Sequence, residues 1–124
     1  MKYKNETHQL IYKSYIVTSP YKFPNDFLAA TFLLSAEREL WRRAKRAIRK
    51  KKIYFDELEK TGLSAYAFVL LHLAKDLYEG THYVVLQDMC DRHLVSDKTC
   101  ELVCSAIGIA RNGYDYIGIK KEFN

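Results

Sequence analysis

Four residues that can bind a soft metal ion lie close together near the end of the chain. Cys90 and His93 are three residues apart, and Cys100 and Cys104 are four apart, so on helices each pair would share a face. Zinc accepts three cysteines and one histidine, but structural zinc sites favour tighter Cys-x-x-Cys pairs. Free cysteine is also a common core residue, and an apolar stripe would be made by Cys100, Val103, Cys104 and Ile107. We therefore expect core cysteines and no metal or other cofactor, with a small zinc protein as an alternative.

A second constellation with catalytic chemistry is the pair formed by His72 and Asp76. Their four-residue spacing would let the carboxylate orient the imidazole for acid–base catalysis. The same spacing is ordinary for two exposed neighbours on a helix, and no nucleophile or second carboxylate accompanies the pair. The sequence also lacks the glycine-rich loops that hold nucleotide phosphates. These features favour a protein without enzymatic activity.

The segment WRRAKRAIRKKK, residues 41–52, is strongly basic. Eight of the eleven residues from Arg42 to Lys52 are cationic, and none of them is acidic. The whole chain has a net charge of +5, so this single segment accounts for its basic character. A local excess of this kind favours an acidic partner: nucleic acid, a nucleoprotein or an acidic protein.

We interpret this segment as a binding surface for an anionic partner. On a continuous helix, several of its cations would share a stripe about 16 Å long, which can meet successive phosphates. The predicted binding residues are Arg38, Arg42, Arg43, Lys45, Arg46, Arg49, Lys50, Lys51 and Lys52. Tyr54 and Phe55 follow directly and could stack on an unpaired base. The alternative is that the cations only solvate the end of a helix, where the helix dipole favours positive charge.

The sequence predicts that helices carry these candidate metal, catalytic and basic residues. The chain has only five glycines and two prolines, and its apolar residues recur at helical spacing. We expect an all-α fold: one compact domain over residues 1–124, built as a bundle of about five helices. The range 23–52 is predicted to form one long helix, capped by Asn25 and with Trp41 facing the core. The range 63–80 is apolar nearly all round, so we expect it to be the central element of the core, between a cap at Ser64 and a stop at Gly80.

The other segments give weaker patterns. The range 96–113 is predicted to be a helix that begins at Ser96 or Asp97 and ends at Asn112-Gly113. Further helices are expected over 81–93 and over 5–17, the latter with one face made by Leu10, Ile11, Ser14 and Tyr15, and a short helical turn over 56–59. In the tail, Asn112-Gly113 stands between two β-rich runs, which is typical of a hairpin. We expect either a short hairpin or an extended segment there.

The second half of the chain resembles a group of small uncharacterised helical proteins of Gram-positive bacteria and their phages. The resemblance is carried by Leu73, Ala74, Leu77, Tyr78 and Gly80, followed by a polar turn and the amphipathic range 96–113. It identifies no catalytic residue. It implies a phage or mobile-element accessory protein, a setting in which small proteins often bind and block a host complex.

These observations together predict a non-enzymatic protein that binds nucleic acid, or a nucleoprotein such as a host defence complex, through a basic helix. Steric inhibition is one form that such binding can take. The alternative is a helical protein–protein interaction module, whose oligomer or host-protein partner covers the basic surface. The sequence shows neither a signal peptide nor a long apolar stretch, and three cysteines are too few for a disulfide framework. We expect a cytoplasmic protein with no membrane partner.

Overall fold

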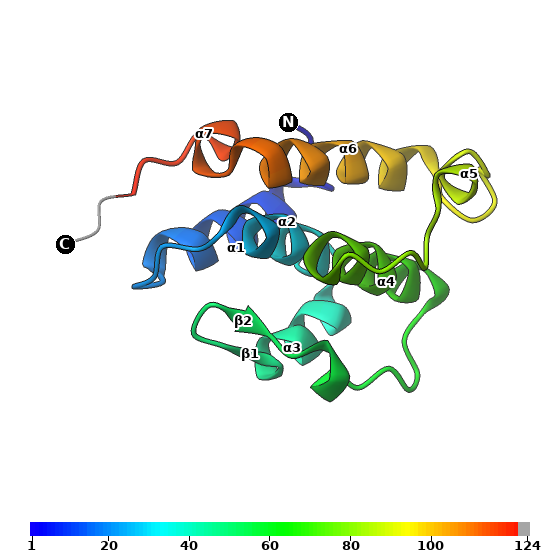
Figure 1. The fold of residues 1–124 in the computed structure, drawn as a ribbon, viewed down its shortest axis with the longest axis horizontal. Helices are drawn as coiled ribbons and strands as arrows, with labels where there is room; N and C mark the ends of the chain where they lie inside the picture. Colours follow the sequence, from blue (N-terminus) through cyan, green and yellow to red (C-terminus); the bar gives the residue numbers. More distant parts are fainter. Residues whose placement is uncertain (122–124) are drawn as a thin grey trace.

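Seven α-helices and one small hairpin make up residues 1–121, the part of the chain that the computed structural model describes (Figure 1). The elements are α1 (Glu6–Thr18), α2 (Asn25–Leu34), α3 (Arg38–Arg46), β1 (Ile48–Arg49), β2 (Lys52–Ile53), the 3-10 helix η1 (Phe55–Glu57), α4 (Ala65–Glu79), α5 (Leu86–Met89), α6 (Asp97–Asn112) and α7 (Tyr114–Ile117). The expected all-α class is confirmed. Helices α5 and α7 have only four residues each, so five longer helices build the bundle, as expected.

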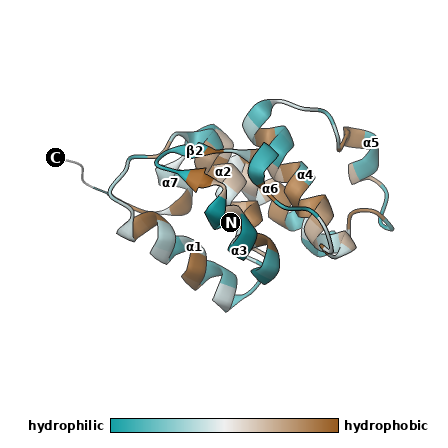
Figure 2. Ribbon diagram, turned by 90° about the horizontal axis from the view of Figure 1, so that it is seen from below, coloured by the Kyte–Doolittle hydropathy of each residue, from teal (hydrophilic) through white to brown (hydrophobic). Residues whose placement is uncertain are grey.

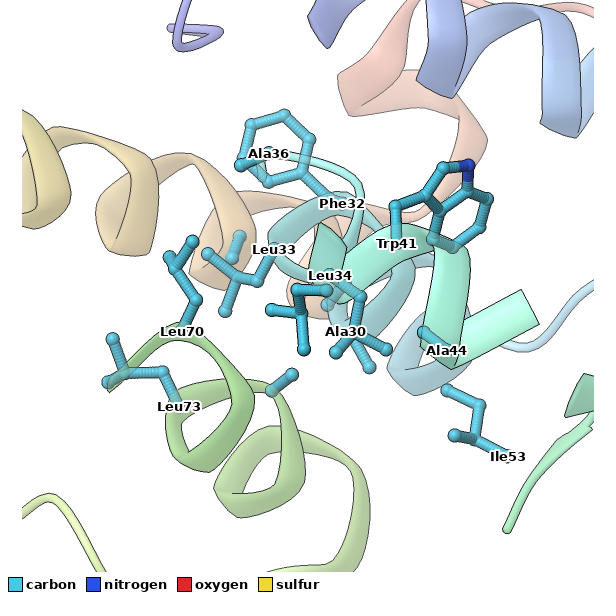
Figure 3. Close-up of a cluster of buried hydrophobic side chains, with 14 of the residues drawn as sticks. Ala30, Phe32, Leu33, Leu34, Ala36, Trp41, Ala44, Ile53, Leu70 and Leu73 are labelled. Atoms are coloured by element: carbon cyan, nitrogen blue, oxygen red, sulfur yellow. The ribbon is translucent and has the colours of Figure 1, made fainter. Parts of the chain in front are cut away.

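Helix α2 is the centre of the core. Eight of its ten residues are buried, and it packs mainly against α4 and α6 (Figure 1). Figure 3 shows Leu33 and Leu34 of α2 facing Leu70 of α4, with Trp41 of α3 nearby. The prediction that the range 63–80 is the central element was therefore wrong. Helix α4 lies beside α2, and one side of it stays partly exposed.

The predicted long helix over 23–52 is broken twice. Helix α2 ends at Leu34, and the side chain of Glu37 caps α3 by accepting the amides of Glu39 and Leu40 at 3.2 and 2.7 Å. Helix α3 ends at Arg46, after which the chain reverses in the β1–β2 hairpin. The start of α2 also differs, because Pro24 occupies the cap position and makes no side-chain cap bond. The first break lets α2 stay inside the core while α3 runs along its surface.

Helix α1 is fastened to α2 by two polar side chains. The amide of Lys4 donates to Nδ1 of His8 at 3.0 Å, so Nε2 carries the proton and donates to the carbonyl of Phe32 at 2.8 Å. The hydroxyl of Tyr12 donates to the carbonyl of Leu28 at 2.7 Å. The buried face is made by His8, Tyr12 and Ile16. The buried face therefore differs from the expected one, which was made by Leu10, Ile11, Ser14 and Tyr15. Leu10 is 67% exposed.

The ends of α4 and α6 agree with the sequence. Ser64 accepts the amide of Ala67, and Gly80 ends α4 in the left-handed conformation. Ser96 caps α6, which ends at Asn112.

The buried face of α6 differs from the predicted stripe and is made by Thr99, Leu102, Val103, Ser105, Ala106 and Ile109. Of the predicted stripe, only Val103 is fully buried, whereas Cys104 and Ile107 are exposed.

Two further expectations were wrong. Only Leu86–Met89 is helical within the range 81–93. In the tail, Tyr114–Ile117 forms α7 where a hairpin or extended segment was expected, and only residues 119–121 are without regular structure. The ring of Tyr116 packs directly on Gly108, where a Cβ atom would lie 2.3 Å from it. The ammonium of Lys121 then donates to the carbonyls of Ile16, Ser19 and Tyr21. The tail is thus tied to the end of α1. The last three residues of the expected domain, 122–124, lie outside the described part of the chain.

Lowering the pH from about 7 to about 5 is expected to remove about 2 kcal/mol of stability through His8. Burial of the imidazole lowers the pKa of His8 from 6.5 to about 4, although the hydrogen bond to Phe32 opposes the shift. The unfolded chain takes up the proton near 6.5 and the folded chain does not, so stability falls from that pH down to about 4. Urea unfolding at a series of pH values measures the loss.

The variant His8→Gln is the control, because its side chain does not titrate. It is expected to be less stable than the parent at pH 7, and the difference should shrink by about 2 kcal/mol at pH 5. Equal losses in the two proteins over this range would contradict the prediction.

Candidate functional site

The nine predicted binding residues lie on two consecutive elements. Helix α3 carries Arg38, Arg42, Arg43, Lys45 and Arg46, and the hairpin carries Arg49, Lys50, Lys51 and Lys52. We call these nine residues the basic surface. In Figure 1, α3 and the hairpin lie side by side on the side of α2 opposite to α6, and Figure 2 shows the hydrophilic character of α3. The prediction of one continuous helical stripe was wrong beyond Arg46.

Two paired isoleucines, one on each strand, hold the base of the hairpin, and the cations lie between them in the chain. Ile48 pairs with Ile53 and Arg49 with Lys52, and the amide of Tyr54 donates to the carbonyl of Ala47 at 2.8 Å. Ile53 is buried, and its amide donates to the hydroxyl of Tyr78 of α4 at 3.2 Å. These contacts hold the hairpin to the body of the protein.

The turn of the hairpin has an unfavourable sequence. Its two residues are Lys50 and Lys51, and Lys50 has a φ of 56°. A positive φ at the first central residue of a two-residue turn normally selects glycine. The lysine is therefore strained, and four consecutive cations also repel each other. Residues with strained backbone conformations often lie at functional sites.

Some cations of the basic surface have structural partners. Nη1 of Arg43 donates to the carbonyls of Glu59 and Thr61 at 3.0 and 2.7 Å, and only 15% of this side chain is exposed. Arg42 pairs with Glu39 at 2.5 Å. Hydrogen bonds from Arg42 and Arg43 lower the pKa of Glu39 to about 2. Arg43 thus fixes the loop after η1 and is not available to bind a second molecule.

The other cations of the surface remain available. Within residues 1–121, no acidic side chain pairs with Arg38, Arg46, Lys50, Lys51 or Lys52, and all five are exposed. Lys45 is also exposed, and its ammonium lies 5.9 Å from the centre of the Trp41 ring. Trp41 itself is buried, as predicted. Five exposed cations with neither an acidic partner nor a ring contact in the described residues can therefore contact an anionic partner.

Two hollows extend the basic surface. A groove of about 910 Å³ runs between α1 and α3, and its cations are Lys4, Arg38, Arg42 and Lys45. A smaller hollow of about 540 Å³ beside the hairpin contains Lys22, Lys51 and Lys52. Sequence reasoning missed Lys4 and Lys22, because both are far from the basic segment in the chain and only the fold brings them near.

The two aromatic residues after the hairpin have different environments. Phe55 is buried, so it is not available to stack on a base as predicted. Tyr54 is 39% exposed. The guanidinium of Arg49 lies over its ring, with the central carbon 4.1 Å from the ring centre. Both terminal nitrogens of Arg49 also donate to the carboxylate of Glu57.

His72 and Asp76 do not form a hydrogen-bonded pair. The carboxylate of Asp76 accepts the Thr81 hydroxyl and the amides of Tyr83 and Val84, at 2.5, 3.0 and 2.8 Å. The ring of His72 is buried and stacks on Tyr83, 3.7 Å from centre to centre. Burial lowers the pKa of His72. Asp76 therefore fastens the loop after α4 and is not oriented as a partner for catalysis.

The cysteines lie differently from the prediction. Cys90 and Cys104 are exposed, and Cys100 is half-buried. Burial raises the pKa of the Cys100 thiol, which disfavours the thiolate that a metal binds. Among residues 1–121, no group of three or more His, Cys, Asp or Glu side chains could hold a metal ion. The alternative of a small zinc protein has no support from this geometry.

Comparison of the chain with protein-family models, curated proteins and solved structures finds no match. None of the helices within residues 1–121 is long and apolar enough to cross a membrane. The site must therefore be interpreted from its own geometry and charge.

Replacing Arg43 with Met is expected to lower the free energy of unfolding by about 1 to 2 kcal/mol. The variant keeps the aliphatic stem but leaves the carbonyls of Glu59 and Thr61 without their charged donor. Arg46→Met is the matched control, since Arg46 is exposed and without an acidic partner in the described residues; its change should stay within about 0.5 kcal/mol. Urea unfolding checks both, and equal effects would refute the structural role of Arg43.

Replacing Lys50 with Gly is expected to stabilise the protein by about 0.5 to 1 kcal/mol. Relief of the positive φ outweighs the added flexibility of the unfolded chain. Lys51→Gly removes the same charge at a position without positive φ, so it should destabilise by a similar amount. Thermal unfolding measures both variants, and the same sign for the two would show that Lys50 is not strained.

Proposed function

We propose that this protein is a non-enzymatic binding protein whose basic surface contacts nucleic acid, either free or within a nucleoprotein complex. The observation that carries this proposal is the group of five exposed, unpaired cations on α3 and the hairpin. Three of them, Lys50, Lys51 and Lys52, are consecutive, and Lys50 occupies a turn position with positive φ where glycine would be more stable. A merely soluble surface does not need a cation at a strained position.

Phosphate groups are the chemistry that suits this surface. Lysine and arginine side chains neutralise phosphates and release condensed counterions, which gives affinity that is independent of sequence and falls with salt. The groove adds Lys4 to the cations of α3, and the hollow beside the hairpin adds Lys22. The groove also contains Glu37 and Glu39, and the hollow contains Asp26, so the added cations lie in surroundings of mixed charge.

The biological setting of the proposal rests on the resemblance of the second half to phage and bacterial accessory proteins. A small protein without catalytic groups acts by occupancy. It can cover nucleic acid, or it can occupy the nucleic-acid path of a host complex and so inhibit it sterically. Binding through one face suits either action.

A protein–protein interaction module is the second candidate function. It is favoured by apolar side chains that are exposed between α4 and α6. Leu86 is 83% exposed, and its apolar neighbours Tyr83, Val85 and Leu94 are exposed as well. A host protein that docks on this segment would leave the basic surface free.

Charge reversal tests the proposed function. The variant with Arg46, Lys50, Lys51 and Lys52 changed to Glu is expected to lose roughly tenfold or more in affinity for RNA or DNA. The slope of log affinity against log salt should fall by about three to four, because each phosphate contact contributes about one. Fluorescence anisotropy with labelled oligonucleotides at low and physiological salt measures both quantities.

The control reverses four cations outside the basic surface: Lys2, Lys98, Arg111 and Lys120, all of which are exposed. It changes the net charge by the same amount, so it should bind nearly as the parent protein does. Equal losses in the two variants would mean that only net charge matters. Absence of binding to any nucleic acid by the parent protein would refute the proposal.

A further inference from the structure

We propose that Arg49 and Tyr54 form a stacking platform for an unpaired base, so that the nucleic acid bound by the basic surface is single-stranded. This inference rests on the proposed function and names its substrate class. The central carbon of the Arg49 guanidinium lies 4.1 Å from the centre of the Tyr54 ring. The Arg49 side chain is 52% exposed, so the guanidinium face turned away from Tyr54 can accept another planar group.

Glu57 holds the guanidinium in place. Its two carboxylate oxygens accept hydrogen bonds from Nη1, at 3.0 Å, and from Nη2 of Arg49. The backbone contributes as well, since the amide of Tyr54 donates to the carbonyl of Ala47 at the base of the hairpin. A flexible side chain is therefore ordered before any ligand arrives, which reduces the entropy lost on binding.

The ion pair gives Arg49 a role different from that of its neighbours. Glu57 already neutralises much of its charge, so Arg49 is a poor ligand for phosphate. The plane of the guanidinium stays available, and guanidinium planes and aromatic rings are the groups on which proteins stack unpaired bases. The adjacent Lys50, Lys51 and Lys52 have no acidic partner within residues 1–121 and suit the phosphates on either side of that base.

A single strand fits this arrangement better than a duplex. The bases of a duplex are stacked on each other and present only their edges in the grooves, whereas a single strand can place one base on the platform. Other exposed tyrosines do not serve this surface. Tyr83 stacks on His72 of α4, and Tyr116 packs on Gly108 of α6.

The test compares the binding of two single-stranded ligands to the parent protein and four variants by fluorescence anisotropy. One ligand is a labelled oligothymidylate, and the other is an abasic deoxyribose-phosphate oligomer of the same length and charge. Arg49→Lys keeps the positive charge but removes the plane. Arg46→Lys is the matched control, because no aromatic ring within residues 1–121 lies beneath the guanidinium of Arg46. Thermal unfolding confirms that each variant is folded.

The parent protein is expected to bind the base-containing strand roughly 5- to 100-fold more tightly than the abasic strand. Arg49→Lys should lose most of this preference while its affinity for the abasic strand stays the same, and Arg46→Lys should keep it. Tyr54→Phe preserves the ring and should behave as the parent, whereas Tyr54→Leu should behave as Arg49→Lys does.

Three results would overturn the inference, and they are distinguishable. Binding that is equal for both ligands, and unchanged by Arg49→Lys, would remove the platform but leave the proposed function intact. No binding to either ligand at low salt would remove both. Tighter binding to a duplex of the same sequence than to the single strand would show that the surface recognises paired nucleic acid and would also reject the platform.

Discussion

Helix α2 is stable only while other elements cover it on every side. Ten residues form a marginal helix in water, and eight of these ten are buried. Helices α4 and α6 cover it with apolar side chains, whereas α1 adds hydrogen bonds from His8 and Tyr12 to its carbonyls. The first and last segments of the chain must therefore assemble together. The hydroxyl of Tyr114 accepts the amide of Phe23, just before α2, and thus joins the two halves directly.

The basic surface follows from this requirement. Helix α3 supplies the remaining cover with Leu40, Trp41 and Ala44, all of which are buried. The opposite side of α3 faces water, so charged residues can occupy it without a loss of packing. The hairpin is held in the same way, because Ile53 is buried and bonds to Tyr78 of α4. The cations therefore project from a rigid base, and a partner that binds them meets an ordered surface.

Neighbouring carboxylates divide the cations by role. Glu39 pairs with Arg42 and Arg43, and Glu57 pairs with Arg49. Hydrogen bonds from these arginines lower the pKa of both carboxyl groups, so both carboxylates are charged at neutral pH. What remains is a set of unpaired lysines and arginines beside an arginine that is ordered over a ring. The first set suits phosphates, and the second suits a base.

The sequence by itself determined the features that depend on local pattern. The scarcity of glycine and proline together with helical periodicity predicted the all-α class, Ser64, Gly80 and Ser96 marked helix ends, and Trp41 was correctly placed in the core. The nine candidate cations were also found, since charge clustering is visible without a structure. The bonds of Arg43 and Arg49 outside α3 were not, because Glu57 and the carbonyls of Glu59 and Thr61 come from later turns of the chain.

Only the tertiary structure decided where helices break and which faces are buried. Helix α2 ends at Leu34 because it must stay enclosed while α3 covers it. The apolar pattern continues across residues 35–37, so the sequence did not indicate a break there. The faces of α1 and α6 were misjudged since polar residues are buried there: His8 finds a carbonyl of α2, and Ser105 accepts the amide of Lys2. In the tail, Tyr114–Ile117 forms α7, where the ring of Tyr116 packs on Gly108. In each case a tertiary contact outweighs the local preference, and such contacts exist only once the chain has folded.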